Sequence, residues 1–155
     1  AVHMTKQNSG RIINFSSQGA FSPRKSRNLA YGAAKAGVMG FTARLCTELK
    51  PYNITVNCIL PSAVTDLFSY ERTSSGDNMP LAPSYEADMV APIVVFLATD
   101  EAQDITGKYI YSGGGDLCIY PAPFNVASSH AFIRKPGKWT ADEIGGVIPS
   151  VLGLD

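Results

Sequence analysis

A long helical stretch lies between two short apolar runs in the first 60 residues of the chain. Residues 29–50 are rich in small residues and stop before Pro51, which predicts one long helix. The runs at 11–15 and 54–60 predict buried strands. In open α/β sheets the carboxyl ends of strands face the ligand crevice. The order therefore predicts an α/β sheet whose functional side chains follow its strands.

Tyr31 and Lys35 stand four residues apart near the start of the predicted helix. Residues four apart lie on one helix face, so the phenol and the ammonium can address one point in space. A free phenol has a pKa near ~10, and a neighbouring cation stabilises its ionised form. The spacing is therefore typical of a general acid/base pair. The alternative is an exposed helix face without function, because the same spacing also occurs by chance.

Ser16 and Ser17 end the first predicted strand, and Ser17 precedes Tyr31 by fourteen residues. A serine at a strand end can donate a hydrogen bond to a substrate carbonyl or alkoxide. The alternative is that both serines terminate the strand and satisfy backbone groups.

The rest of the chain continues the pattern as far as residue 115. Residues 66–85 are irregular, which is typical of a functional loop or of a mobile surface segment. Residues 87–98 predict a helix, in which Pro92 is tolerable only near the first turn. Residues 108–112 predict the last strand, followed by Gly113-Gly-Gly115.

These motifs, taken in order, resemble the carboxy-terminal half of a classical short-chain dehydrogenase/reductase over nearly all of residues 5–115. The resemblance implies part of a doubly wound parallel-sheet, Rossmann-like domain. It also implies an oxidoreductase that interconverts a secondary alcohol and a ketone by hydride transfer with NAD or NADP. The carboxy-terminal tail is similar to that of a bacterial subgroup resembling the dehydrogenase units of multifunctional β-oxidation enzymes.

The resemblance also implies roles for individual residues. Tyr31 resembles the catalytic acid/base, Lys35 the residue that assists it and holds the nicotinamide ribose, and Ser17 the serine that orients the carbonyl. In the family, one turn touches the nicotinamide end of the cofactor, and the residues that resemble it here are Pro61, Ser62, Val64 and Thr65. The family usually carries glycine where Ser62 stands. The loop at 66–85 corresponds to a lid over the substrate.

The amino-terminal nucleotide-binding half of the family is missing from the sequence. No G-x-x-x-G-x-G turn precedes Ser17, and Gly113-Gly-Gly115 opens no amphipathic helix. We expect residues 1–115 to form the carboxy-terminal half of the dehydrogenase domain and 116–155 an extension with a short helix from Thr140 to about 152. Three interpretations stay open: a catalytically inactive fragment, an interaction module on the same scaffold, and part of a longer enzyme, which we favour.

Composition restricts the remaining function classes. The chain has 155 residues, 45% of them hydrophobic, and no net charge, which suits one compact domain and argues against a nucleic-acid partner. No run of apolar residues indicates a membrane span or a secretion signal. Three dispersed cysteines and two isolated histidines indicate neither disulfides nor a metal site, and fit a cytoplasmic protein.

We further predict a homodimer or homotetramer in addition to a small-molecule alcohol or ketone partner. The long helix carries an apolar stripe, Val38, Phe41, Leu45 and Leu49. Either this stripe or the small-residue face of the helix is expected to meet a second subunit, and the other face then packs on the helix's own sheet.

Overall fold

The computed structural model describes most of the chain. The described residues are 1–21, 29–63, 86–121, 136, 138 and 140–152. The helices and strands in chain order are α1 (Val2–Gln7), β1 (Gly10–Phe15), η1 (Gln18–Ala20), α2 (Leu29–Leu49), η2 (Lys50–Tyr52), β2 (Ile54–Pro61), η3 (Ala87–Val90), α3 (Ala91–Leu97), η4 (Asp100–Ala102), β3 (Tyr109–Gly113), β4 (Asp116–Tyr120) and α4 (Ala141–Leu152). They fall into two units, Ala1–Pro121 and Ala122–Asp155.

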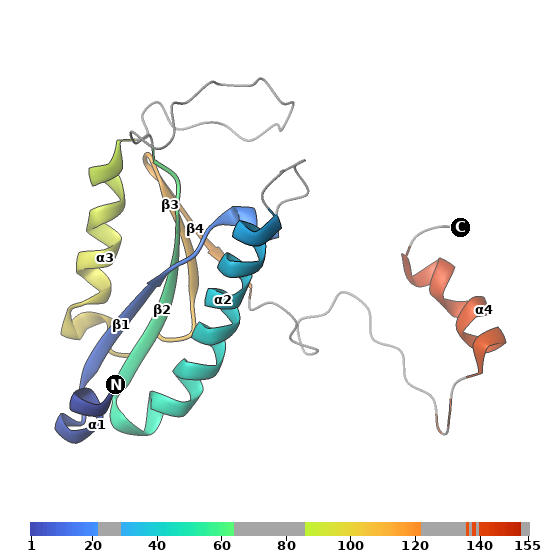
Figure 1. The fold of residues 1–155 in the computed structure, drawn as a ribbon, viewed down its shortest axis with the longest axis horizontal. Helices are drawn as coiled ribbons and strands as arrows, with labels where there is room; N and C mark the ends of the chain where they lie inside the picture. Colours follow the sequence, from blue (N-terminus) through green and yellow to red (C-terminus); the bar gives the residue numbers. More distant parts are fainter. Residues whose placement is uncertain (22–28, 64–85, 122–135, 137, 139, 153–155) are drawn as a thin grey trace. The chain divides into compact units, whose positions relative to one another are not determined.

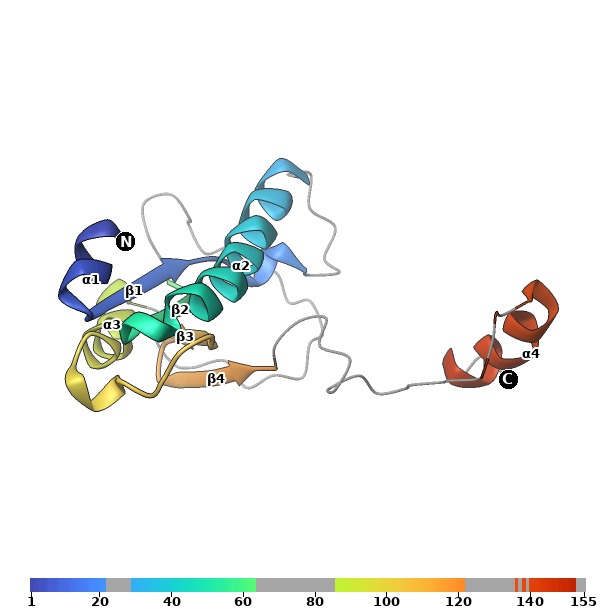
Figure 2. The same cartoon turned by 90° about the horizontal axis from the view of Figure 1, so that it is seen from below.

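The first unit contains a four-stranded sheet in the order β1-β2-β3-β4. β1 pairs parallel with β2, and β2 pairs parallel with β3, whereas β4 runs antiparallel to β3. Figure 1 shows α2 and α3 on opposite sides of this sheet, and Figure 2 shows the sheet from below. The fold is therefore an α/β Rossmann-like arrangement, with helices on both faces of a mostly parallel sheet.

Apolar clusters cover the central strands of the sheet on both faces. On the α2 face, Met39 packs with Cys58, Leu60 and Tyr109. Further along the same face Leu49 packs with Ile54 and Val56. The α3 face holds a third cluster, formed by Ile59, Val90, Leu97, Ala102 and Ile110.

β2 lies inside the sheet between β1 and β3, and its residues Ile54 to Leu60 are all buried. Its even-numbered side chains face α2 and Ile59 faces α3, as expected from the two-residue repeat of a strand. Each fully buried aliphatic side chain of this kind contributes roughly 1.5–3 kcal/mol. Covered on both faces, β2 is a continuous apolar run apart from Thr55 and Asn57, as is typical of parallel strands.

The predicted strands at 11–15 and 54–60 are confirmed as β1 and β2. The predicted long helix is confirmed as α2, which ends at Leu49 before Pro51. The region predicted as one helix at 87–98 begins as the 3-10 turn η3 and continues as α3. Pro92 lies in the first turn of α3, where its missing N–H leaves no helical hydrogen bond unmade.

The predicted strand at 108–112 is confirmed as β3, but it is not the last strand, because β4 follows it as the second arm of a hairpin. Gly113 pairs with Asp116, so Gly114 and Gly115 form a two-residue turn between the arms. Gly114 has a φ of 57°, which glycine adopts without steric cost. The sheet therefore extends to Tyr120, past residue 115, where we expected the dehydrogenase half to end. The organisation into a dehydrogenase half and an extension stays a prediction.

Three members of the apolar stripe on α2 pack on the helix's own sheet. Leu49 belongs to one of the apolar clusters there, and Val38 and Leu45 pack against those clusters. Phe41 is 58% exposed and does not share their environment. The face of α2 that remains open carries Phe41 together with small residues.

The second unit is described for α4 and a few residues before it. Thr140 Oγ1 accepts a hydrogen bond from Glu143 N at 3.3 Å, and a carboxylate oxygen of Glu143 accepts one from Thr140 N at 2.8 Å. The predicted capping box is therefore confirmed. Within the described part of the chain, no helix has the length and apolar character needed to cross a membrane. The irregular segment predicted at 66–85 lies outside the described residues.

Candidate active site

Ser17 lies directly beyond the carboxyl end of β1 and begins the short turn η1. Its backbone is extended, and its Oγ accepts a hydrogen bond from Gly19 N at 3.1 Å. A serine hydroxyl has one donor and two acceptor positions, so this contact leaves its hydrogen available to a substrate oxygen. The side chain is half-buried, so a ligand can approach it.

Tyr31 and Lys35 share one face of the first turns of α2, as their spacing predicts. Lys35 Nζ lies 5.8 Å from the centroid of the Tyr31 ring. The tyrosine side chain is 40% exposed and the lysine is half-buried. The ammonium therefore lies over the tyrosine ring within the range of a cation–π contact.

Ser17 and Tyr31 flank one point in space, which is marked by Gly19. A side-chain carbon placed on Gly19 would lie 3.3 Å from Ser17 Oγ and 3.4 Å from Tyr31 Cε1. A carbon placed on Gly32 would lie 3.4 Å from the Gly19 carbonyl oxygen. Glycine at 19 and 32 thus lets the backbone of η1 rest against α2. The structure brings together the three side chains expected to be catalytic.

The ammonium of Lys35 is held at the end of β1. Lys35 Nζ donates to the carbonyl oxygen of Phe15 at 3.1 Å. A lysine ammonium has three donors, so two remain for a hydroxyl-bearing ligand beside Tyr31. The neighbouring Ser16 is buried and points the other way, with its Oγ donating to the Lys35 carbonyl oxygen at 2.7 Å. Ser16 therefore has the structural role, and Ser17 is the serine that remains accessible.

The residues expected at the cofactor lie at the same edge of the sheet. Phe15 pairs with Ile59, so the segments that lead to Ser17 and to Pro61 both leave the paired register at the same edge of the sheet. Ser62 follows, and its N–H donates to the Ser112 carbonyl oxygen at 2.9 Å. The two other expected residues, Val64 and Thr65, lie outside the described residues.

Close approach at Gly113 holds the turn after β2. A side-chain carbon on Gly113 would lie 2.8 Å from both Cβ and the carbonyl oxygen of Ser62. Any larger residue would displace that backbone, so glycine at this position permits the turn to reach the strand edge. The sequence showed only a glycine run here, with no sign that it contacts residue 62.

Two buried acidic groups lie beneath the site on the α2 face. Burial raises the pKa of the Cys58 thiol, and a hydrogen bond with Thr42 opposes the increase. Burial also raises the pKa of the Tyr109 phenol, whose Oη donates to the Met39 carbonyl oxygen at 2.9 Å. Both groups are therefore neutral core residues rather than candidates for proton transfer at neutral pH.

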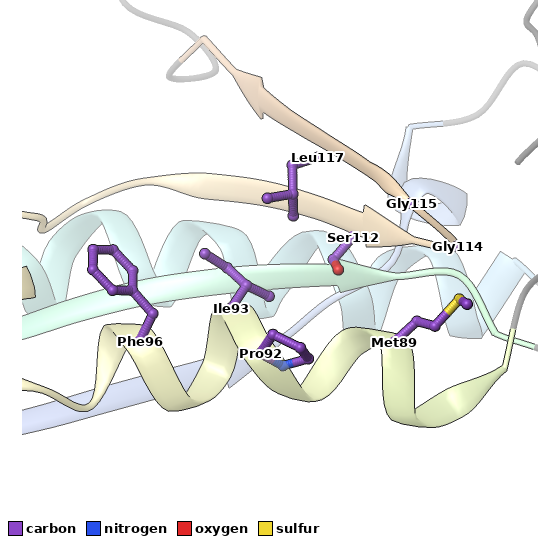
Figure 3. Close-up of a pocket in the computed structure, with 8 residues that line it drawn as sticks. All are labelled: Met89, Pro92, Ile93, Phe96, Ser112, Gly114, Gly115 and Leu117. Atoms are coloured by element: carbon purple, nitrogen blue, oxygen red, sulfur yellow. The ribbon is translucent and has the colours of Figure 1, made fainter.

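A pocket of about 430 Å³ opens on the other face of the sheet. Figure 3 shows Met89, Pro92, Ile93 and Phe96 facing Leu117 and the end of β3. None of the candidate catalytic residues lines this pocket. The residues predicted to be catalytic therefore lie outside this pocket.

Comparison with known proteins places the chain in a family. A family model described as Enoyl-(Acyl carrier protein) reductase matches residues 1–116. The chain belongs to the short-chain dehydrogenase/reductase family. This is a family of oxidoreductases.

Individual relatives agree with this assignment. The chain is 41% identical over 118 residues to the 3-oxoacyl-(acyl-carrier-protein) reductase FabG of Staphylococcus aureus, covering 72% of the chain and 47% of that protein. It is 35% identical over 116 residues to the trans-4-hydroxycyclohexanecarboxylate dehydrogenase of Sinomonas cyclohexanicum, covering 75% of the chain and 44% of that protein. It thus spans about half the length of the curated relatives it matches.

A solved structure extends the likeness beyond the residues that the family model matches. A short-chain dehydrogenase from Mycobacterium avium is 31% identical, with a TM-score of 0.70 that covers 94% of the chain and 46% of that structure. An acetoin dehydrogenase from Salmonella typhimurium is 29% identical, with a TM-score of 0.58 over 74% of the chain and 47% of that structure.

Proposed function

We propose that this chain is the catalytic half of an NAD(P)-dependent oxidoreductase that interconverts a secondary alcohol and a ketone. The observation that carries the proposal is the convergence of Ser17 and Tyr31 on one point beside the Lys35 ammonium. The three compounds that name the relatives above, a 3-oxoacyl group, a hydroxycyclohexanecarboxylate and acetoin, each contain a ketone or a secondary alcohol.

Each of the three side chains has a distinct task in this proposal. The Ser17 hydroxyl donates a hydrogen bond to the substrate oxygen and fixes its direction. The Tyr31 phenol gives its proton to that oxygen in reduction and removes the proton in oxidation. The Lys35 ammonium lowers the free energy of the phenolate that forms when the proton leaves.

The residues present fit the nicotinamide end of the cofactor. Two unused donors on the Lys35 ammonium match ribose hydroxyls, and the turn at Pro61 and Ser62 lies at the same strand edge. NAD(P) supplies or accepts the hydride when it is bound. No glycine-rich turn for the pyrophosphate occurs in the sequence, so a nucleotide-binding half on the same or a second polypeptide forms part of the proposal.

Replacement of Tyr31 by phenylalanine tests the proposal in the intact protein, which includes the nucleotide-binding half. Consumption of NAD(P)H would be followed with a 3-oxoacyl thioester or acetoin, and formation of NAD(P)H from NAD(P)+ with a cyclohexanol carboxylate. Loss of the proton carrier should lower kcat by ~10²–10⁴-fold. Tyr52→Phe is the matched control, because Tyr52 is 43% exposed and lies at the far end of α2. Wild-type turnover in Tyr31→Phe with any of these substrates would show that the role is wrongly assigned.

Calorimetric titration of the 155-residue chain with NAD(H) and NADP(H) tests whether this chain binds the dinucleotide by itself. Without residues that bind the pyrophosphate, the chain alone should show no binding in the micromolar range. Micromolar affinity would mean that the cofactor site lies elsewhere in this chain. A wild-type intact protein that neither binds the dinucleotide nor turns over an alcohol or ketone would favour the interaction module instead.

A further inference from the structure

The second arm of the β3–β4 hairpin reaches the turn that carries Ser17. Gln18 follows Ser17 directly, and its Nε2 donates to Tyr120 Oη at 2.6 Å. The two residues are 102 positions apart in the chain. Tyr120 is the last residue of β4, the strand that the sequence does not predict.

An apolar contact accompanies this hydrogen bond. Ala20, at the end of η1, and Tyr120 both pack against the cluster around Met39 and Tyr109. Tyr109 is the cross-strand partner of Tyr120 in the hairpin. Since the Tyr109 hydroxyl also bonds the Met39 carbonyl in α2, the hairpin is joined to the helix that carries the acid/base pair.

The turn η1 is therefore held from two sides. On one side Gly19 lies against Tyr31, and its carbonyl oxygen lies against Gly32. On the other side Gln18 donates to Tyr120, and Ala20 packs against the same buried cluster as Tyr120. Motion of η1 away from α2 would move the Ser17 hydroxyl relative to the Tyr31 ring. Reacting groups misplaced by about 1 Å can cost ~10²-fold in rate.

We infer that Tyr120 is a positioning residue that braces η1 and so fixes Ser17 against Tyr31. The inference rests on the proposed function, because it assigns Tyr120 a role in that same site. Tyr120 acts through Gln18 and touches no reacting atom in this assignment. The hairpin arm beyond Gly115 then serves catalysis as well as completing the sheet.

Tyr120→Phe in the intact protein removes the acceptor and keeps the ring. We expect kcat to fall roughly three- to tenfold, the equivalent of one net hydrogen bond, with the KM for the dinucleotide unchanged. Gln18→Met should have the same effect, and the double variant should be no worse than either single variant, because both remove one contact. Ile119→Ala is the control: Ile119 is the adjacent residue, is 68% exposed and faces the other side of the sheet.

Amide hydrogen exchange at residues 17–21 provides a readout that does not depend on activity. It should become faster in Tyr120→Phe and stay unchanged in Ile119→Ala, with both variants melting near the wild type. If the wild type is active and Tyr120→Phe keeps its kcat, the inference is overturned, whatever the exchange rates show. If the exchange responds as expected but the wild type turns over no substrate, the proposed function fails, whereas the inference that Tyr120 holds η1 in place is retained.

Discussion

Ser16 and Lys35 take part in two hydrogen bonds that join the end of β1 to α2. The Ser16 hydroxyl donates to the Lys35 carbonyl oxygen at 2.7 Å, while the Lys35 ammonium donates to the carbonyl oxygen of Phe15, one residue before the serine, at 3.1 Å. The two bonds run in opposite directions and close a ring between strand and helix. These bonds fix both the backbone and the ammonium of Lys35 relative to the end of β1.

Ser16→Ala removes one bond of this ring from a buried position. We expect the free energy of unfolding to fall by about 1 kcal/mol, the usual net value of such a hydrogen bond. Urea denaturation measures this change. Ser9→Ala is the matched control, because Ser9 is exposed and surface substitutions of this kind usually stay within about 0.5 kcal/mol. Equal stability of both variants would show that the ring contributes nothing.

Side chains larger than methyl at Gly19 should separate Ser17 from Tyr31. The nearest atoms already lie 3.3 and 3.4 Å from the position of a Cβ, so alanine fits tightly and valine does not. We expect Gly19→Val to lower kcat by ~10²-fold with little loss of stability, since Gly19 is exposed. Gly115→Ala, where a Cβ meets nothing within 4 Å, is the control for loss of a glycine. Normal turnover in Gly19→Val would contradict the geometry proposed for the site.

Stability should fall in alkaline solution because of the buried thiol of Cys58. Burial raises its pKa in the folded state, so from about pH 8.5 upward the unfolded state loses the proton first. The free energy of unfolding therefore decreases as the pH rises towards the folded-state pKa, and is unaffected by this group at lower pH. Denaturation from pH 7 to 10 should show a weaker decline in Cys58→Ala, although that variant is less stable throughout. Cys118→Ala, at an exposed cysteine, should decline like the wild type.

The open face of α2 is proposed to meet a second copy of the chain. Phe41 is 58% exposed, and a Cβ on Gly37 or Gly40 would meet nothing within 4 Å, so a second helix could approach closely. We expect light scattering of the intact protein to give a dimer or tetramer, and Phe41→Glu to shift it towards the monomer. A monomeric wild type with unchanged mass and stability in Phe41→Glu would refute the proposal.

Much of the fold could be predicted because its causes are local. The apolar run of β2, the small-residue helix α2 before Pro51 and the capping box at Thr140 all depend on residues close in sequence. The Tyr31–Lys35 pair belongs to the same class, because four residues of helix suffice to bring the two side chains together.

Tertiary pairing decided the rest. β4 exists because the Gly114–Gly115 turn folds Asp116–Tyr120 back onto β3, and its own residues do not form a strand alone. Ser16 and Ser17 are adjacent and chemically alike, yet beyond the end of β1 Ser16 is buried against the Lys35 backbone, whereas Ser17 stays accessible beside Tyr31. The contact between Gln18 and Tyr120 joins residues 102 apart, and only the completed sheet brings them together. A sequence therefore determines which residues can do the chemistry, whereas strand register and the faces of the sheet determine which of them meet, because those depend on contacts made far along the chain.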